Sequence, residues 1–144
     1  MRMYVLSQLL GRHVDSSSGV IARGYMGNNT HTAGCLINTN KVFSICTGIV
    51  LAVDTDPFND IITVTVENNS SRWIRYCMLS SANVKVGQIL KISDLIGVGT
   101  KGTIQLEYCT SETSKFPVRY LSKQLYKHDP TPVIFGMINL SEAV

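Results

Sequence analysis

Short apolar or alternating runs that recur between turn-forming residues constrain the fold of this chain most strongly. They are VFSIC, GIVLAVD, IITVTVEN, WIRYCML, QILKI, TIQLEYC and VIFGMI, and turns such as DTDPFND, ENNSS and HDPTP separate several of them. This spacing predicts an all-β fold, a mostly antiparallel sandwich. In IITVTVEN, Ile62, Val64 and Val66 fall on one face of the strand, and Ile61, Thr63 and Thr65 fall on the other. Apolar residues recur at helical spacing over 118–126, directly after Pro117, and this pattern predicts a short helix there.

Composition limits the class of protein. The chain has 144 residues with 44% apolar and 16% charged residues, which is typical of one globular domain. Its net charge of +3 comes from scattered basic residues, so the sequence does not predict a nucleic-acid partner. The apolar stretch near Met1 is too short for a signal peptide or a membrane span. Four cysteines without a C-x-x-C pair are expected to be buried thiols, and they are Cys35, Cys46, Cys77 and Cys109.

Two patterns that carry chemistry in other proteins lack their structural context here. Gly97, Gly99 and Gly102 spell G-x-G-x-x-G, but a strand-like run follows them in place of a helix. We interpret these glycines as positive-φ positions in a tight turn. The histidines His13 and His31 lie far apart from each other and from His128, and no G-x-S-x-G elbow occurs. The sequence therefore names no nucleophilic site.

The order of four motifs resembles the lysostaphin-like family of peptidoglycan zinc endopeptidases. In that family a Y-x-H-L strand end precedes V-x-x-G-Q-x-V, then I-G-x-x-G, then H-L-H-F-E, and an earlier H-x-G-x-D-I supplies further ligands. The corresponding residues in this chain are 32–37, 76–79, 84–88, 96–99 and 103–108, so the resemblance covers about residues 30–110. It implies the β-sandwich of that family, and the alternation in these strands places Cys77 and Leu106 in the core.

The same resemblance implies that every residue that would hold or serve the zinc ion has been replaced. Zinc is held by imidazole, thiolate or carboxylate groups, so we expect no metal, no other cofactor and no enzymatic activity. Shifting the first motif by one residue would place His31 and Cys35 on two ligand positions, which is an alternative at this stage. The former ligand positions are occupied by Thr32, Leu36, Met78, Thr103 and Gln105.

We expect three segments: an N-terminal arm over 1–29, the degenerate endopeptidase domain over 30–112, and a C-terminal extension over 113–144. The expected function is a non-catalytic structural protein of a phage virion, in the tail tip, hub or baseplate. It would be made in the host cytoplasm and would contact other tail proteins and copies of itself. The alternative is a pseudoenzyme that binds a cell-wall peptide or regulates a wall hydrolase. The apolar run PVIFGMINL would form either an interface or part of the core.

Overall fold

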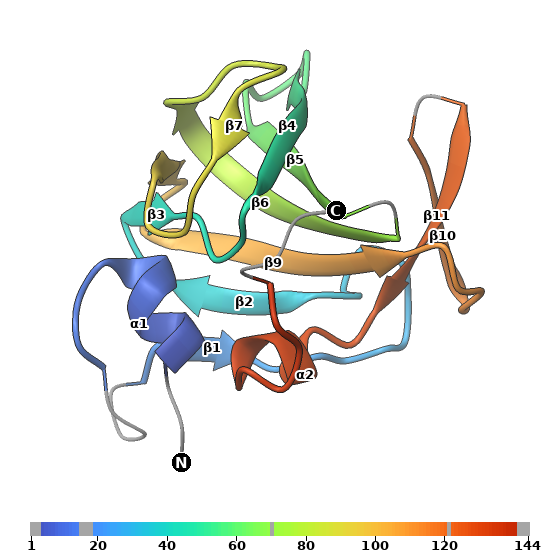
Figure 1. Cartoon of the computed structure of the whole chain (residues 1–144), viewed down its shortest axis with the longest axis horizontal. Helices are drawn as coiled ribbons and strands as arrows, with labels where there is room; N and C mark the ends of the chain where they lie inside the picture. Colours follow the sequence, from blue (N-terminus) through green and yellow to red (C-terminus); the bar gives the residue numbers. More distant parts are fainter. Residues whose placement is uncertain (1–3, 15–18, 70, 121, 141–144) are drawn as a thin grey trace.

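The computed structural model describes residues 4–14, 19–69, 71–120 and 122–140, and it confirms the all-β prediction. Antiparallel strands dominate this part of the chain, and two short helices lie beside them (Figure 1). Neither helix within these ranges is long and apolar enough to cross a membrane. The elements are α1 (Tyr4–Leu10), β1 (Ile21–Arg23), β2 (Cys35–Asn38), β3 (Lys41–Phe43), β4 (Gly48–Thr55), β5 (Ile62–Asn69), β6 (Arg72–Ala82), β7 (Ile89–Leu90), β8 (Leu95–Gly99), β9 (Thr103–Thr110), β10 (Phe116–Tyr120), β11 (Lys123–His128) and α2 (Thr131–Ile134).

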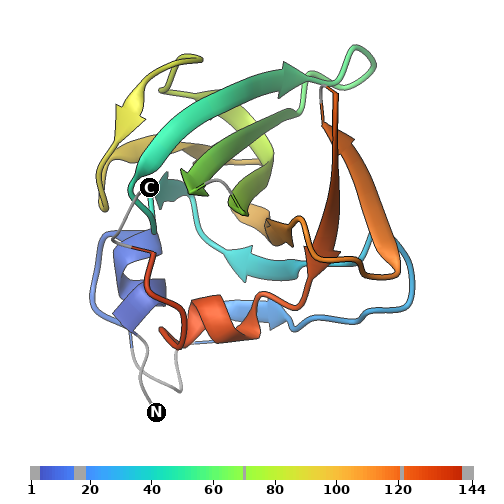
Figure 2. The ribbon, with the colours of Figure 1, turned by 45° about the vertical axis from the view of Figure 1, so that its right-hand side comes forward.

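The strands form one branched antiparallel sheet in the order β1-β2-β9-β6-β5-β4-β7. Strand β8 pairs with β6 and with β3, while β11 pairs with β9 and with β10. Figure 2 shows the sheet curling around the interior, with α1 and α2 at one end. Strand β9 lies at the centre, because it pairs with β2 and β11 along one edge and with β6 along the other.

The main core lies on the inner face of these strands. Alternation places Ile104 and Leu106 of β9 opposite buried residues of β2 and β6. Tyr76 is fully buried there, and its hydroxyl accepts a hydrogen bond from the backbone N–H of Ile45 at 3.1 Å. Val64 and Val66, which alternation placed on one face of their strand, are also buried there, while Ile62 on the same face is half-buried.

Both flanking segments contribute to this same core. Leu6 and Leu9 of α1 and Val133 of α2 belong to the cluster that contains the inner strand residues. The segment boundaries at residues 30 and 112 stay a prediction. The burial of Val133, with Phe135 and Ile138 packed against the cluster, places the C-terminal run in the core rather than on an open surface.

Two local predictions were wrong. The expected helix over 118–126 is the hairpin of β10 and β11, in which Val118 lies opposite Leu125. Its residues at 116, 118, 120 and 126 are aromatic or β-branched, which favours strands more strongly than the helical spacing favours a helix. The expected strand VIFGMI instead begins in α2, because Pro130 and Pro132 fix φ near the helical value at its start.

The interpretation of the glycines was correct for Gly102, whose φ is 74°, and wrong for Gly97 and Gly99. Those two lie within β8 without positive φ. A Cβ at Gly97 would lie 2.2 Å from the carbonyl oxygen of Ser81, and one at Gly99 would lie 2.7 Å from that of Thr39. These positions therefore require glycine because neighbouring backbones approach closely.

Candidate functional site

Strands β2, β9 and β6 have an apolar inner face, which lines the core, and a polar outer face. On β9, Gln105 and Glu107 point away from the core and alternate with its buried apolar residues. Gln105 lies opposite Leu36 of β2 and opposite Cys77 of β6, while Glu107 lies opposite Arg75. Cross-strand partners share a face in an antiparallel sheet, so these side chains form one layer.

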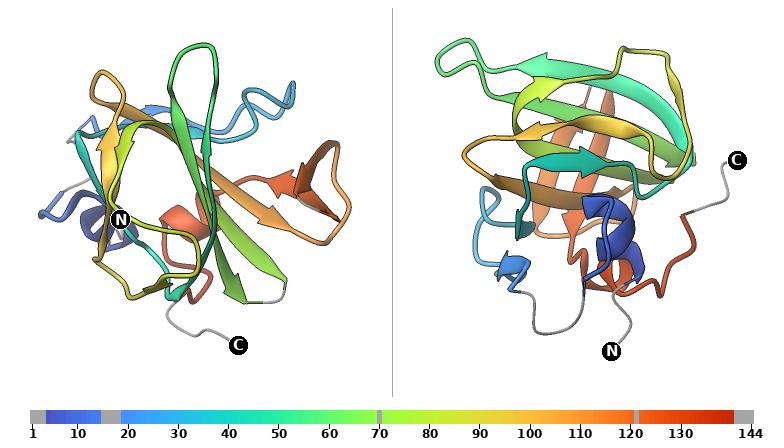
Figure 3. Two further views of the ribbon diagram at one scale, coloured as in Figure 1. Left: turned by 90° about the horizontal axis from the view of Figure 1, so that it is seen from above. Right: turned by 90° about the vertical axis from the view of Figure 1, so that its left-hand side faces the viewer.

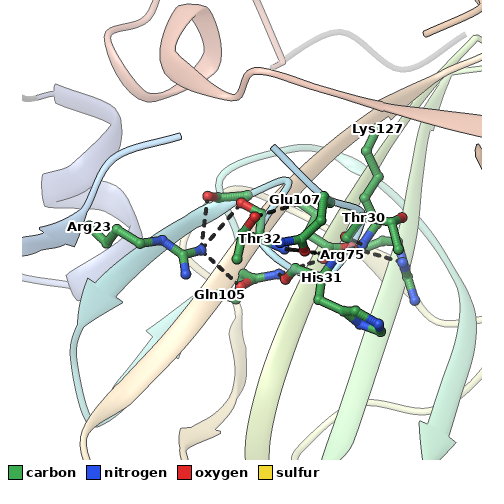
Figure 4. A network of polar contacts seen from close by, with 10 residues as sticks. Arg23, Thr30, His31, Thr32, Arg75, Gln105, Glu107 and Lys127 are labelled. Atoms are coloured by element: carbon green, nitrogen blue, oxygen red, sulfur yellow. Dashed lines mark hydrogen bonds and ion pairs between the residues drawn. The ribbon is translucent and has the colours of Figure 1, made fainter. Parts of the chain in front are cut away.

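Glu107 is the centre of a buried polar network on this face (Figure 4). Its Oε1 atom lies 2.8 Å from Arg75 Nη1, and its Oε2 atom lies 2.8 Å from Lys127 Nζ. The Nε2 of Gln105 also donates to Glu107 Oε2, at 2.8 Å. Glu107 is only 2% exposed and Lys127 7% exposed, so the two charges are paired away from bulk water. Both carboxylate oxygens are therefore occupied by donors.

Arg23 of β1 extends the network towards the segment before β2. Its Nη2 donates to Gln105 Oε1 at 3.2 Å and to the carbonyl oxygens of Thr32 and Gly34 at 3.4 Å. The Nε2 of Gln105 donates to the carbonyl oxygen of His31 at 3.0 Å. Together with a bond from Lys127 Nζ to Thr30 O at 2.8 Å, these contacts fix residues 30–34 across the polar face.

The charge balance of this network is positive. Two side-chain cations, Arg75 and Lys127, contact the single carboxylate of Glu107, and a third, Arg23, binds the neighbouring Gln105. Like charges repel more strongly where burial lowers the effective dielectric constant. The face therefore disfavours a further cation beside Gln105 and Glu107.

The structure brings together some of the five positions that the resemblance singled out. Leu36 and Gln105 are direct cross-strand partners. Thr103 begins β9 and lies with Met78 on the wall of a pocket of about 570 Å³. Thr32 contributes its carbonyl oxygen to Arg23, while its hydroxyl donates to Asn28 Oδ1 at 2.7 Å.

The side chains at these positions do not fit zinc. They are a hydrocarbon, a thioether, two hydroxyls and one amide, and zinc sites in proteins use imidazole, thiolate or carboxylate ligands. The alternative pair was wrong, because Cys35 lies in the core opposite Leu106 and His31 is exposed. Burial raises the pKa of the Cys35 thiol to about 11, which disfavours the thiolate. The described residues contain no group of three histidines, cysteines or acidic residues that could hold a metal.

The predicted burial was right for Leu106 and wrong for Cys77. Cys77 lies on the outer face opposite Gln105 and is half-buried. Burial and the nearby Glu107 carboxylate both raise the pKa of its thiol. Met78 is in the left-handed region, with φ of 69°, and the strand alternation breaks at this residue. Simple alternation therefore fails at the point where β6 approaches the pocket.

A second small core lies further along the outer face. Trp73, Cys109 and Leu125 are buried together, so the hairpin of β10 and β11 covers this part of β6 and β9. The Nε1 of Trp73 donates to Glu67 Oε2 at 3.0 Å, and Lys123 Nζ lies 5.5 Å from the centre of the Trp73 ring. The hairpin also supplies Lys127, which joins this small core to the Glu107 network.

Sequence reasoning missed the charged members of the network. Glu107 stands at the glutamate of the final family motif, and that match was its only signal. Arg23 is separated by 82 residues from its partner Gln105, and Lys127 by 20 residues from Glu107. No local pattern connects residues at such separations.

No family model matches the chain, and no curated protein matches it. Solved structures do match. The antimicrobial peptidase lysostaphin from Staphylococcus simulans has a TM-score of 0.56 at 21% identity, over 77% of this chain and 47% of that one. LytU has a TM-score of 0.58 at 18% identity, over 85% and 89% of the two chains.

A catalytic domain of EnpA, a prophage-encoded M23 protein of Enterococcus faecalis, has a TM-score of 0.53 at 13% identity, over 69% and 75% of the two chains. This chain spans between 34% and 47% of the longer peptidase structures that it matches. The chain thus has the fold of the lysostaphin-type M23 peptidases.

Proposed function

We propose that this chain is a non-catalytic assembly module built on the lysostaphin-type fold. The observation that carries the proposal is the buried network in which Arg23, Arg75 and Lys127 hold Gln105 and Glu107. Gln105 and its partner Leu36 are two of the positions that correspond to metal ligands in the family resemblance. The side-chain oxygen at these two positions, Gln105 Oε1, already accepts a hydrogen bond from the cation Arg23, which supports a structural role for this face.

We place this module in a phage tail, in the tip, hub or baseplate. The prophage-encoded EnpA has the same fold, which supports a phage setting for a chain of this architecture. In that setting the partners are other tail proteins and further copies of the chain.

Metal content and hydrolysis test the non-catalytic part of the proposal. Protein purified from zinc-supplemented medium is expected to contain far less than one zinc per chain by plasma emission spectrometry. It is also expected not to clear a suspension of cell walls that lysostaphin clears. Stoichiometric zinc together with clearing would overturn the proposal.

A gain-of-function variant tests whether the site has been located correctly. We expect Thr32→His, Leu36→Asp and Gln105→His together, with Arg23→Ser to remove the neighbouring cation, to produce zinc binding that the parent lacks. The matched control carries the same changes except Leu36→Asn, which removes the carboxylate and should bind zinc at least about tenfold more weakly. Zinc binding that is equal in both variants would show that these residues do not share one site.

Binding to purified cell walls separates assembly from the wall-peptide alternative. The assembly proposal predicts that the chain stays in the supernatant when walls are sedimented. Saturable co-sedimentation with walls would favour a wall-binding pseudoenzyme instead.

A further inference from the structure

The loop between β4 and β5 exposes an aromatic side chain that the fold itself does not use. Phe58 is 96% exposed, more than the other exposed large apolar residues of the described chain. Aromatic residues are enriched at the centres of interfaces, so this exposed ring is a candidate contact residue.

This loop is held closed by its own hydrogen bonds. The backbone N–H of Asp56 donates to Ile61 O at 2.8 Å, and that of Asp60 donates to Asp56 O at 3.0 Å. The side chain of Asp56 accepts from the N–H of Phe58 at 2.8 Å, and that of Asn59 accepts from the N–H of Ile61 at 3.0 Å. These bonds fix the backbone that carries Phe58, which lowers the entropy that the loop loses when a partner binds the ring.

The pocket of about 570 Å³ lies directly beside this loop. Asn59 and Ile61 of the loop form one wall, and the turn before β9 with Met78 of β6 forms the other. The β4–β5 loop and the β8–β9 turn project from the same end of the molecule (Figure 3, right). The pocket is within the size range of ligand pockets and has room for a phenyl ring. Its other lining residues are Thr100, Lys101 and Thr103.

We propose that two copies of the chain associate by inserting Phe58 of each copy into this pocket of the other. A two-fold interface uses the same patch on both copies, so the patch must contain a projection and a matching hollow side by side. The β4–β5 loop and its pocket meet that requirement. This inference rests on the proposed function and names the partner of the assembly module as a second copy.

Charge also favours this pairing. The loop around Phe58 carries the exposed carboxylates Asp56 and Asp60, and the opposite rim of the pocket carries the exposed Lys101. Exchange of the phenyl rings brings the acidic loop of one copy to the basic rim of the other, twice in each dimer. Complementary charges across an interface favour the correct pairing.

Sedimentation equilibrium over a concentration series tests the proposal. The unmodified chain is expected to form dimers, and Phe58→Ala is expected to weaken them by at least about 100-fold, since each dimer loses two buried rings. Phe58 makes no core contact, so circular dichroism of the variant should match the parent. The control is Met137→Ala, which removes another side chain that is 76% exposed and should leave dimerisation unchanged.

A mixing experiment tests the reciprocal exchange itself. Thr103→Trp fills the pocket and leaves Phe58 intact, so this variant and Phe58→Ala should each be monomeric alone. Their mixture restores one of the two contacts and should form a heterodimer weaker than the unmodified dimer. The inference is wrong if the unmodified chain stays monomeric at about 1 mM, if Phe58→Ala and Met137→Ala behave alike, or if mixing restores nothing. None of these results would affect the zinc and cell-wall tests.

Discussion

At the scale of single residues, the Glu107 carboxylate compensates the buried Lys127 and the half-buried Arg75, at 2.8 Å each. We expect Glu107→Ala to lower the free energy of unfolding by about 3–5 kcal/mol, because it leaves Arg75 and Lys127 without a counter-charge. Urea unfolding followed by circular dichroism measures the change. Glu112→Ala, at an exposed position, is the matched control and should change the free energy by less than about 0.5 kcal/mol. Equal effects of the two substitutions would show that the network is not buried in solution.

The buried thiols predict how stability depends on pH. Burial raises the pKa of Cys35 and Cys46 to about 11, and burial together with the Glu107 charge raises that of Cys109 to about 12. The unfolded chain releases these protons near the ordinary thiol pKa, while the folded chain keeps them. The free energy of unfolding is therefore expected to fall between about pH 9 and pH 11, by up to about 1.4 kcal/mol per pH unit for each thiol.

Urea unfolding at pH 8, 9 and 10 measures this slope. Cys46→Ala should make the slope shallower, whereas Val50→Ala should lower stability at every pH and leave the slope unchanged. A slope that Cys46→Ala does not alter would exclude ionisation of this thiol as a cause.

The candidate site shows what single residues reveal from sequence alone. Alternation within β9 predicted that Leu106 lies in the core, and the structure confirms it, with its neighbour Gln105 on the opposite face. It could not predict that Cys77 lies opposite Gln105, because the register between β6 and β9 depends on the whole sheet. Arg23 reaches Gln105 only after β1 has paired with β2.

At the scale of elements, strand patterns were reliable where one face is buried and failed at the two ends of the chain. The runs at β4, β5, β6 and β9 are strands as expected. Helix α1 was not expected, since residues 1–29 were predicted only as an N-terminal arm. The hairpin of β10 and β11 and helix α2 depend on packing against other elements, which local spacing does not contain.

Helix α2 gives a direct test of the core that both flanks share. Ile134 is 1% exposed, so Ile134→Ala is expected to lower the free energy of unfolding by about 2–5 kcal/mol. Met137→Ala, three residues further on and largely exposed, should change it by less than about 0.5 kcal/mol. Thermal or urea unfolding of the two variants measures the difference. A small effect of Ile134→Ala would show that this segment is dispensable for the core.

At the scale of the whole molecule, motif order predicted the fold better than it predicted function. The fold is confirmed by structures that share at most 24% identity with this chain. Its function stays a proposal. The polar network and the pocket beside Phe58 form where segments that are distant in the sequence meet, and motif order does not predict such contacts. Sequence alone placed residues on strands, whereas the three-dimensional arrangement determines which side chains meet.

The central place of β9 has a consequence for how the chain folds during synthesis. Strand β9 joins β6 to both β2 and β11, yet it begins only at residue 103. A nascent chain that ends before β9 leaves β2 and β6 without their shared neighbour and exposes their unpaired edges. Pairing over such sequence separations is slow, because a long loop must close before the contacts form. The part of the sheet around β9 therefore cannot close until residues 103–110 have left the ribosome, so the pairing of β9 with β2, β6 and β11 is a late step in folding.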